Sequence, residues 1–160
     1  MSRIRGGVVA ALLMTAAPLS AHEPAPKATQ THTLSASEIG AAATVDQFHA
    51  ALDRGDTRAA SALLAENALI FESGGVERTK AEYAAHHLPA DAEFSRSVSS
   101  IVTRRTGSSI GALAWVASEG RTSGTYKGKP LDLKTTETML LRRTSDGWKI
   151  VHIHWSSAKR

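Results

Sequence analysis

The chain has 160 residues, no cysteine and a formal charge of +4 at pH 7. The lack of cysteine excludes disulfides, thiolate zinc sites and cysteine nucleophiles. Two of the 19 basic residues, Arg3 and Arg5, lie at the start of the chain, and the others nearly balance the 15 acidic residues. Because no basic stripe is interleaved with aromatic residues, we expect no nucleic-acid partner.

The first 21 residues have the pattern of an export signal. A basic start precedes an apolar run over residues 8–17, and small residues follow up to Ala21. The run is too short to span a bilayer, so we expect cleavage after Ala21, a periplasmic or secreted mature protein and no membrane partner. Residues 22–34 are polar with two prolines and predict a flexible linker. One domain over residues 35–158 remains.

Two helices are predicted at the start of this domain. The first begins near Ser35, which has capping-box spacing with Glu38, and ends at Gly55. A shorter helix is predicted over 57–65. The first helix carries an apolar stripe at helical spacing, made of Val45, Phe48 and Leu52.

A strand over 67–72, a third helix over 80–88 and four more strands complete the domain. Pro89 is expected to end the third helix. The four strands are predicted over 93–105, 109–122, 131–143 and 148–157. This order predicts an α+β fold, in which a curved antiparallel sheet wraps around the N-terminal helices.

The strand over 131–143 contains the clearest anomaly. Its odd positions are mostly apolar and its even positions mostly polar, so the odd face is predicted to point inward. Glu137 lies on that odd face. A carboxylate there is costly unless it is paired, hydrogen-bonded or protonated. Glu137 is therefore a candidate functional residue.

The neighbouring strands bring further candidates toward the same interior. Alternation in the strand over 109–122 puts Trp115 and Glu119 on one face, which we expect to point inward. In the first strand, Glu72 is in register with Ala68 and Ile70. We therefore expect Glu72, Glu119 and Glu137 to approach one space.

The last strand carries two histidines, His152 and His154, at alternating positions. The opposite face is predicted to point inward and holds Val151, Ile153 and Trp155. Two such histidines can chelate a metal, but no third ligand is near in sequence, so we favour a surface or interface role. Because Trp148 and Ile150 share the histidine face, a partner subunit is expected to cover it, in a homodimer.

The third helix ends with His86 and His87, and Tyr83 lies one turn earlier. Two interpretations stay open. The helix dipole favours histidine at a helix C-terminus. Alternatively, Tyr83 and one imidazole form the rim of a pocket, as base or ligand contact.

Four segments resemble the nuclear transport factor 2-like superfamily, which includes ketosteroid isomerases, SnoaL-like polyketide cyclases and the calcium/calmodulin-dependent kinase association domain. They read FHAALDRGDTRAASALLAENALIFES, GALAWVASEG, TTETMLLRR and GWKIVHIHWSS. The resemblance implies a bent sheet around helices, a conical pocket and, often, a dimer.

The resemblance also implies roles for individual residues. By position, Glu72 matches the proton-shuttling carboxylate of ketosteroid isomerases, and Glu137 matches a protonated acid that donates to the oxyanion. Trp115 and Trp155 match pocket walls. The first-helix position of the family's oxyanion tyrosine is Phe48 here, which argues against steroid-type isomerisation.

Binding of a small organic molecule in an acidic and aromatic pocket is the function that the sequence favours. The expected ligand contacts are Phe48, Tyr83, His86, His87, Trp115, Glu119, Met139, Ile153 and Trp155. No cofactor is expected.

The alternative is a general acid/base enzyme that transfers protons on a small carbonyl compound, with Glu72 as the base and Glu137 as a neutral donor. Two further possibilities are a metal site made of the three glutamates with His86 or His87, and glutamates paired with Arg or Lys in a purely structural role.

Overall fold

The computed structural model describes residues 36–160, so the predicted signal, linker and Ser35 lie outside the described residues. The helices are α1 (Ala36–Asp53), α2 (Thr57–Ala62), α3 (Lys80–Ala85) and α4 (Leu88–Ser97). The strands are β1 (Leu64–Glu72), β2 (Gly75–Glu77), β3 (Val98–Ile110), β4 (Leu113–Tyr126), β5 (Lys129–Thr144) and β6 (Gly147–Lys159). Within residues 36–160, none of the helices combines the length and apolar character needed to cross a bilayer.

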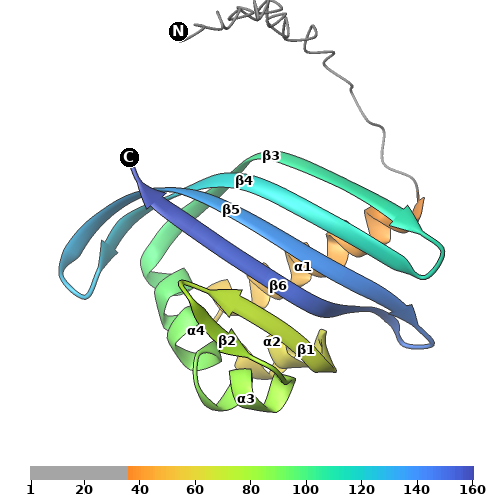
Figure 1. The fold of residues 1–160 in the computed structure, drawn as a ribbon. Helices are drawn as coiled ribbons and strands as arrows, with labels where there is room; N and C mark the ends of the chain where they lie inside the picture. Colours follow the sequence, from red (N-terminus) through yellow and green to blue (C-terminus); the bar gives the residue numbers. More distant parts are fainter. Residues whose placement is uncertain (1–35) are drawn as a thin grey trace, which may run out of the picture. The chain divides into compact units, whose positions relative to one another are not determined.

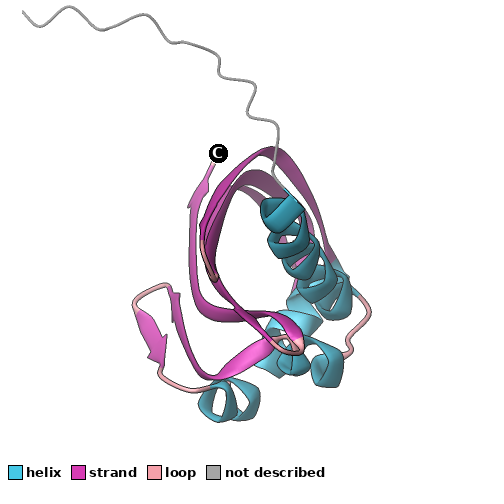
Figure 2. Ribbon diagram, turned by 90° about the vertical axis from the view of Figure 1, so that its right-hand side faces the viewer, coloured by secondary structure: helices cyan, strands magenta, loops and turns pink. Residues whose placement is uncertain are grey.

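The six strands form one open sheet in the order β2-β1-β6-β5-β4-β3 (Figure 1). Strands β3 to β6 form the predicted antiparallel meander, whereas β1 runs parallel to β6, so the sheet is mixed. Figure 2 shows that the sheet is strongly curved and that α1 runs along its hollow side. The expected α+β fold with helices against a curved sheet is confirmed.

The helices follow local sequence signals. In α1 the predicted stripe is the buried face, with Val45 and Phe48 fully buried and Leu52 only 4% exposed. Asp56 caps α2 through the backbone N–H of Ala59. Thr79 caps α3 in the same way.

The segment after α3 differs from the prediction. Residues 88–97 form α4, and the strand expected from residue 93 begins only at Val98. Pro89 lies in the first turn of α4, where a helix does not need the missing N–H. The same residue that was expected to end one helix therefore opens the next.

The inward faces of the strands are partly as predicted. In β5 the odd residues Glu137, Met139 and Leu141 are buried. In β4 the prediction was wrong, because Ala114 and Val116 point inward and Trp115 is 42% exposed on the outer face. The inner face of β4 packs in the same core as α1, where small side chains fit and a tryptophan does not.

A β-bulge in β6 changes the faces of that strand. The pairing shifts between Leu140–His152 and Leu141–Ile150, which leaves Val151 as the extra residue. Ile150 and Ile153 are therefore both fully buried, and Trp148 packs against the core. This corrects the expectation that Trp148 and Ile150 share the histidine face.

Candidate functional site

The inner face of the sheet, α1 and α4 enclose a cavity of about 380 Å³. Five of its lining residues form one row across five adjacent strands, because each is the register partner of the next. This inner row consists of Glu72, Trp155, Glu137, Ser118 and Arg105. Register partners point to the same side of a sheet, so the fold brings these residues together from distant parts of the chain.

Glu137 lies at the centre of the inner row and is only 9% exposed. Its Oε2 accepts hydrogen bonds from His49 Nε2 and from Trp155 Nε1, both at 2.7 Å. Its Oε1 is buried and has no hydrogen-bond partner among residues 36–160. Both donors therefore act on one oxygen and fix the orientation of the carboxylate.

The contacts of Glu137 and His49 shift the pKa of both side chains. Burial alone would raise the pKa of Glu137, but the hydrogen bond and charge of His49, the Trp155 N–H and the Arg105 charge together lower it. For His49, burial works against the charged form, yet the hydrogen bond and charge of Glu137 raise the pKa overall. Both shifts favour an imidazolium beside a carboxylate, and a lowered pKa of Glu137 does not favour the neutral donor that the sequence resemblance implies.

Arg105, on β3, lies at one end of the inner row. Its guanidinium donates to Asp46 on α1 at 2.6 Å and to the Ser118 hydroxyl at 3.2 Å. Asp46 and His49 are one turn apart on α1, and both line the cavity. Helix α1 therefore places one carboxylate, Asp46, and one imidazole, His49, beside the cavity.

Glu72 occupies the other end of the inner row. Burial and the negative charge of Asp91 raise the pKa of Glu72, and His87 opposes them. Asp91, on α4, also lines the cavity and accepts a hydrogen bond from the buried Tyr83 hydroxyl at 2.6 Å. Two strand spacings separate Glu72 from Glu137, which is about 10 Å along the row. Trp155 lies between them in the row, so a ligand that contacts both carboxylates has to span about this distance across the indole.

The predicted site residues fall into three groups. Glu72, Glu119, Glu137 and Trp155 line the cavity. A second set is fully buried and forms the core next to it: Phe48, Tyr83, Met139 and Ile153. Phe48 stacks on Trp155 with ring centroids 6.3 Å apart, and so supports the cavity wall from behind.

The remaining predicted residues lie elsewhere. Trp115 is on the outer face of the sheet. His86 and His87 are exposed at the junction of α3 and α4, and His87 hydrogen-bonds to the buried Glu77. Glu119 does line the cavity, but its carboxylate is 63% exposed and lies 3.9 Å from the Arg104 guanidinium. The residues considered for a metal site are therefore not gathered around one point.

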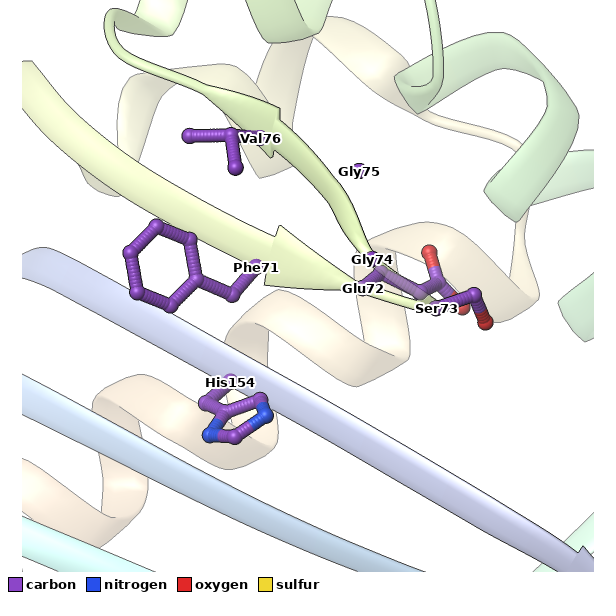
Figure 3. Close-up of a pocket in the computed structure, with 7 residues that line it drawn as sticks. All are labelled: Phe71, Glu72, Ser73, Gly74, Gly75, Val76 and His154. Carbon is purple, nitrogen blue, oxygen red and sulfur yellow. The ribbon is translucent and has the colours of Figure 1, made fainter.

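His152 and His154 differ in their contacts. His152 Nδ1 donates to the Leu69 carbonyl at 2.8 Å, and both imidazoles lie edge-on to Phe71. Among residues 36–160 no group of three or more potential metal-ligating side chains is found. Figure 3 shows Phe71, Val76 and His154 around a second, more open hollow of about 240 Å³ at the β1–β2 turn.

Sequence reasoning missed His49, Asp91 and Arg105. His49 lies one turn after Val45 and one turn before Leu52, so it borders the apolar stripe, and this was the available signal. Asp91 was hidden because α4 was not predicted. Arg105 was expected in a strand, but its pairing with Asp46 depends on the packing of α1.

The chain belongs to the SnoaL-like domain family, whose profile matches residues 41–159. It is similar to a candidate ketosteroid isomerase from Shewanella frigidimarina NCIMB 400, with 40% identity over 73% of this chain and 94% of the other, and a TM-score of 0.70. The comparison with curated proteins finds no match.

Two more distant structures share the fold. A nuclear transport factor 2-like protein with a cystatin-like fold from Novosphingobium aromaticivorans is 17% identical, over 74% of this chain and 80% of the other, with a TM-score of 0.63. The calcium/calmodulin-dependent kinase II hub of S. rosetta is also 17% identical, over 79% of this chain and all of the other, with a TM-score of 0.62. The fold is therefore nuclear transport factor 2-like.

Proposed function

We propose that the protein binds a small carbonyl compound in the cavity and transfers a proton on it. The observation that carries this proposal is the 2.7 Å hydrogen bond between His49 and Glu137 at the wall of the cavity that Glu72 also lines. The similarity to a candidate ketosteroid isomerase supports the same reaction class. A positively charged donor and a carboxylate base are the two groups that such a reaction needs.

The ligand body is expected to combine apolar surface with a few polar groups. Away from the charged groups, the cavity is lined by serine and threonine residues and by a set of apolar residues: Leu52, Phe94, Ile101, Val102 and Leu133. A cavity of about 380 Å³ suits a molecule with one or two small rings. Its polar end is expected near His49, because this charged donor extends into the cavity next to Trp155.

The first step uses His49 as the donor. Its Nε2 is engaged by Glu137, and no partner for its Nδ1 is found among residues 36–160, so Nδ1–H is available to a ligand oxygen. The imidazolium polarises the carbonyl and stabilises the negative charge that forms on its oxygen. His49 thereby supplies the donor that Phe48 lacks.

The second step uses Glu72 as the base. Its carboxylate removes a proton from the carbon next to the carbonyl, and the C–H electron pair forms the enolate. Return of that proton to a different carbon gives the isomer and regenerates the carboxylate. Because burial and Asp91 raise the pKa of Glu72, its carboxylate is a stronger base than an exposed glutamate.

Deuterium exchange tests this proposal without knowledge of the natural substrate. The full chain is incubated in D₂O with a β,γ-unsaturated cyclohexenone, and uptake at the carbons beside the carbonyl is followed by NMR. We expect exchange above the buffer rate, reduced at least about 100-fold in Glu72→Gln. His49→Gln is expected to slow exchange as well.

Two control variants keep the test specific. Glu66→Gln changes a glutamate that is 84% exposed on the same strand and should leave exchange intact. His86→Gln changes an exposed histidine outside the cavity. Exchange that persists at the wild-type rate in Glu72→Gln would contradict the proposal. Ketone binding with no exchange would instead assign the protein to the non-catalytic binders.

We further propose that the protein acts after export as a homodimer. The sequence pattern of residues 1–21 supports export. For the dimer, the support is an outer row of register partners, Trp115, Leu140, His152 and Leu69, in which Trp115 and Leu140 are about 40% exposed. An exposed apolar row of this kind is typical of an interface, and a second copy is the occupant we expect because one structural neighbour is a hub.

A further inference from the structure

We propose that Asp91 is a positioning residue for Glu72. Held by Tyr83 as a fixed negative charge beside the cavity, it sets the pH range over which Glu72 changes between acid and base. This inference rests on the proposed function only in the catalytic role that it gives to Glu72.

The geometry of Asp91 supports a fixed charge. Asp91 and Glu72 line the same cavity from opposite elements, α4 and β1. The Tyr83 hydroxyl donates to Asp91 Oδ2 at 2.6 Å, and Tyr83 itself has no exposed surface. A buried donor of this kind restricts the carboxylate to one orientation and favours its ionised form.

Tyr83 is itself held in place by the inner row. Its ring lies 6.4 Å from that of Trp155, and Trp155 is the register partner of Glu72. A chain of neighbours, Asp91, Tyr83, Trp155 and Glu72, therefore runs around one end of the cavity, with Asp91 and Glu72 at its two ends. By contrast, no hydrogen-bond partner of the Glu72 carboxylate is found among residues 36–160.

The charges around both carboxyls give the direction of the effect. Asp91 raises the pKa of Glu72, and His87 lowers the pKa of each. Tyr83 lowers the pKa of Asp91 against the larger effect of burial. Asp91 has in Tyr83 a donor that favours its ionised form, and the charge of ionised Asp91 holds the proton on Glu72 to higher pH.

Carboxyl titration by NMR measures this effect without any substrate. The full chain is labelled with ¹³C at the Asp and Glu side-chain carboxyls and titrated as wild type, Asp91→Asn and Tyr83→Phe. In Asp91→Asn we expect the Glu72 midpoint to fall by at least about half a pH unit. In Tyr83→Phe we expect the Asp91 midpoint to rise, because the donor to its carboxylate is gone.

Two more variants make the outcome specific. Asp91→Glu keeps the charge and should restore most of the wild-type Glu72 midpoint. Asp53→Asn removes another cavity-lining carboxylate, one that hydrogen-bonds to Ser95, and should leave Glu72 unchanged. An unchanged Glu72 midpoint in Asp91→Asn, or an equal shift in Asp53→Asn, would overturn the inference. If the midpoint shifts but the ketone shows no exchange, the proposed reaction fails and this inference stands.

Discussion

The two faces of the same strands carry opposite kinds of side chain. The inner row is polar, and its central carboxylate is 9% exposed. The outer row is mostly apolar, and its Trp115 is 42% exposed. This reverses the ordinary rule that charge faces water and apolar surface is buried. The difference is what motivates the two proposals: a ligand for the polar inner row, and a second copy of the chain for the apolar outer row.

The largest expected effect on stability is at the centre of the inner row. Glu137→Ala removes the acceptor for His49 and Trp155 and leaves their donors without it in a buried site. We expect the free energy of unfolding in urea to fall by about 2 to 3 kcal/mol. Glu119→Ala, at an exposed carboxylate, should cost far less. Equal losses in the two variants would show that the inner row is not a paired network.

The corresponding substitution on the outer row tests the proposed dimer. Trp115→Asp places a charge on the exposed apolar row, and we expect the dimer dissociation constant to rise at least about 100-fold. Analytical ultracentrifugation of the full chain measures this. Ile39→Asp, at an exposed apolar residue on α1, is the control and should leave the dimer intact. A wild-type chain that is monomeric at all concentrations would contradict the dimer.

A smaller effect is expected in the pH dependence of stability. Because the pKa of His49 is raised above its ordinary value of 6.5, its stabilisation is full below that value and is lost as pH rises through the folded-state pKa. We expect wild type to lose more stability than His49→Gln between pH 6 and pH 9. Thermal unfolding at both values checks this, with His86→Gln as the control. Parallel losses in all three proteins would refute the ion pair.

The smallest expected effect is at Trp155. Trp155→Phe keeps an aromatic ring against Phe48 but removes one of the two donors to Glu137. We expect a loss of about 1 kcal/mol in urea unfolding, because His49 still pairs with the carboxylate. A loss as large as that of Glu137→Ala would mean that the indole N–H, and not His49, holds the carboxylate.

Alternation was enough to predict part of the site. In β5 the apolar odd face is long and regular, so the position of Glu137 could be predicted from the sequence. Glu72 and Trp155 followed from the same reasoning in β1 and β6. These residues were predictable because strand alternation is a local property of the backbone.

The remaining parts depend on packing that no local pattern shows. Trp115 was misplaced because its size outweighed Ala114 and Val116, although α1 leaves room only for small residues there. The bulge at Val151 reverses the face of Ile150. His49 and Asp91 reach the cavity only through the way α1 and α4 pack against the sheet. The place of His49 beside the apolar stripe was the one local signal, and Asp91 had none.

One NMR titration tests most directly whether the inner face is the ligand site. The β,γ-unsaturated cyclohexenone is added to the full chain while the three indole N–H signals and the His49 ring are observed. We expect the chemical shifts of Trp155 and His49 to change until the site is saturated with the ketone, and those of Trp115 and Trp148 to stay constant. Movement of Trp115 with Trp155 and His49 unchanged would put the ligand on the outer face and contradict the account.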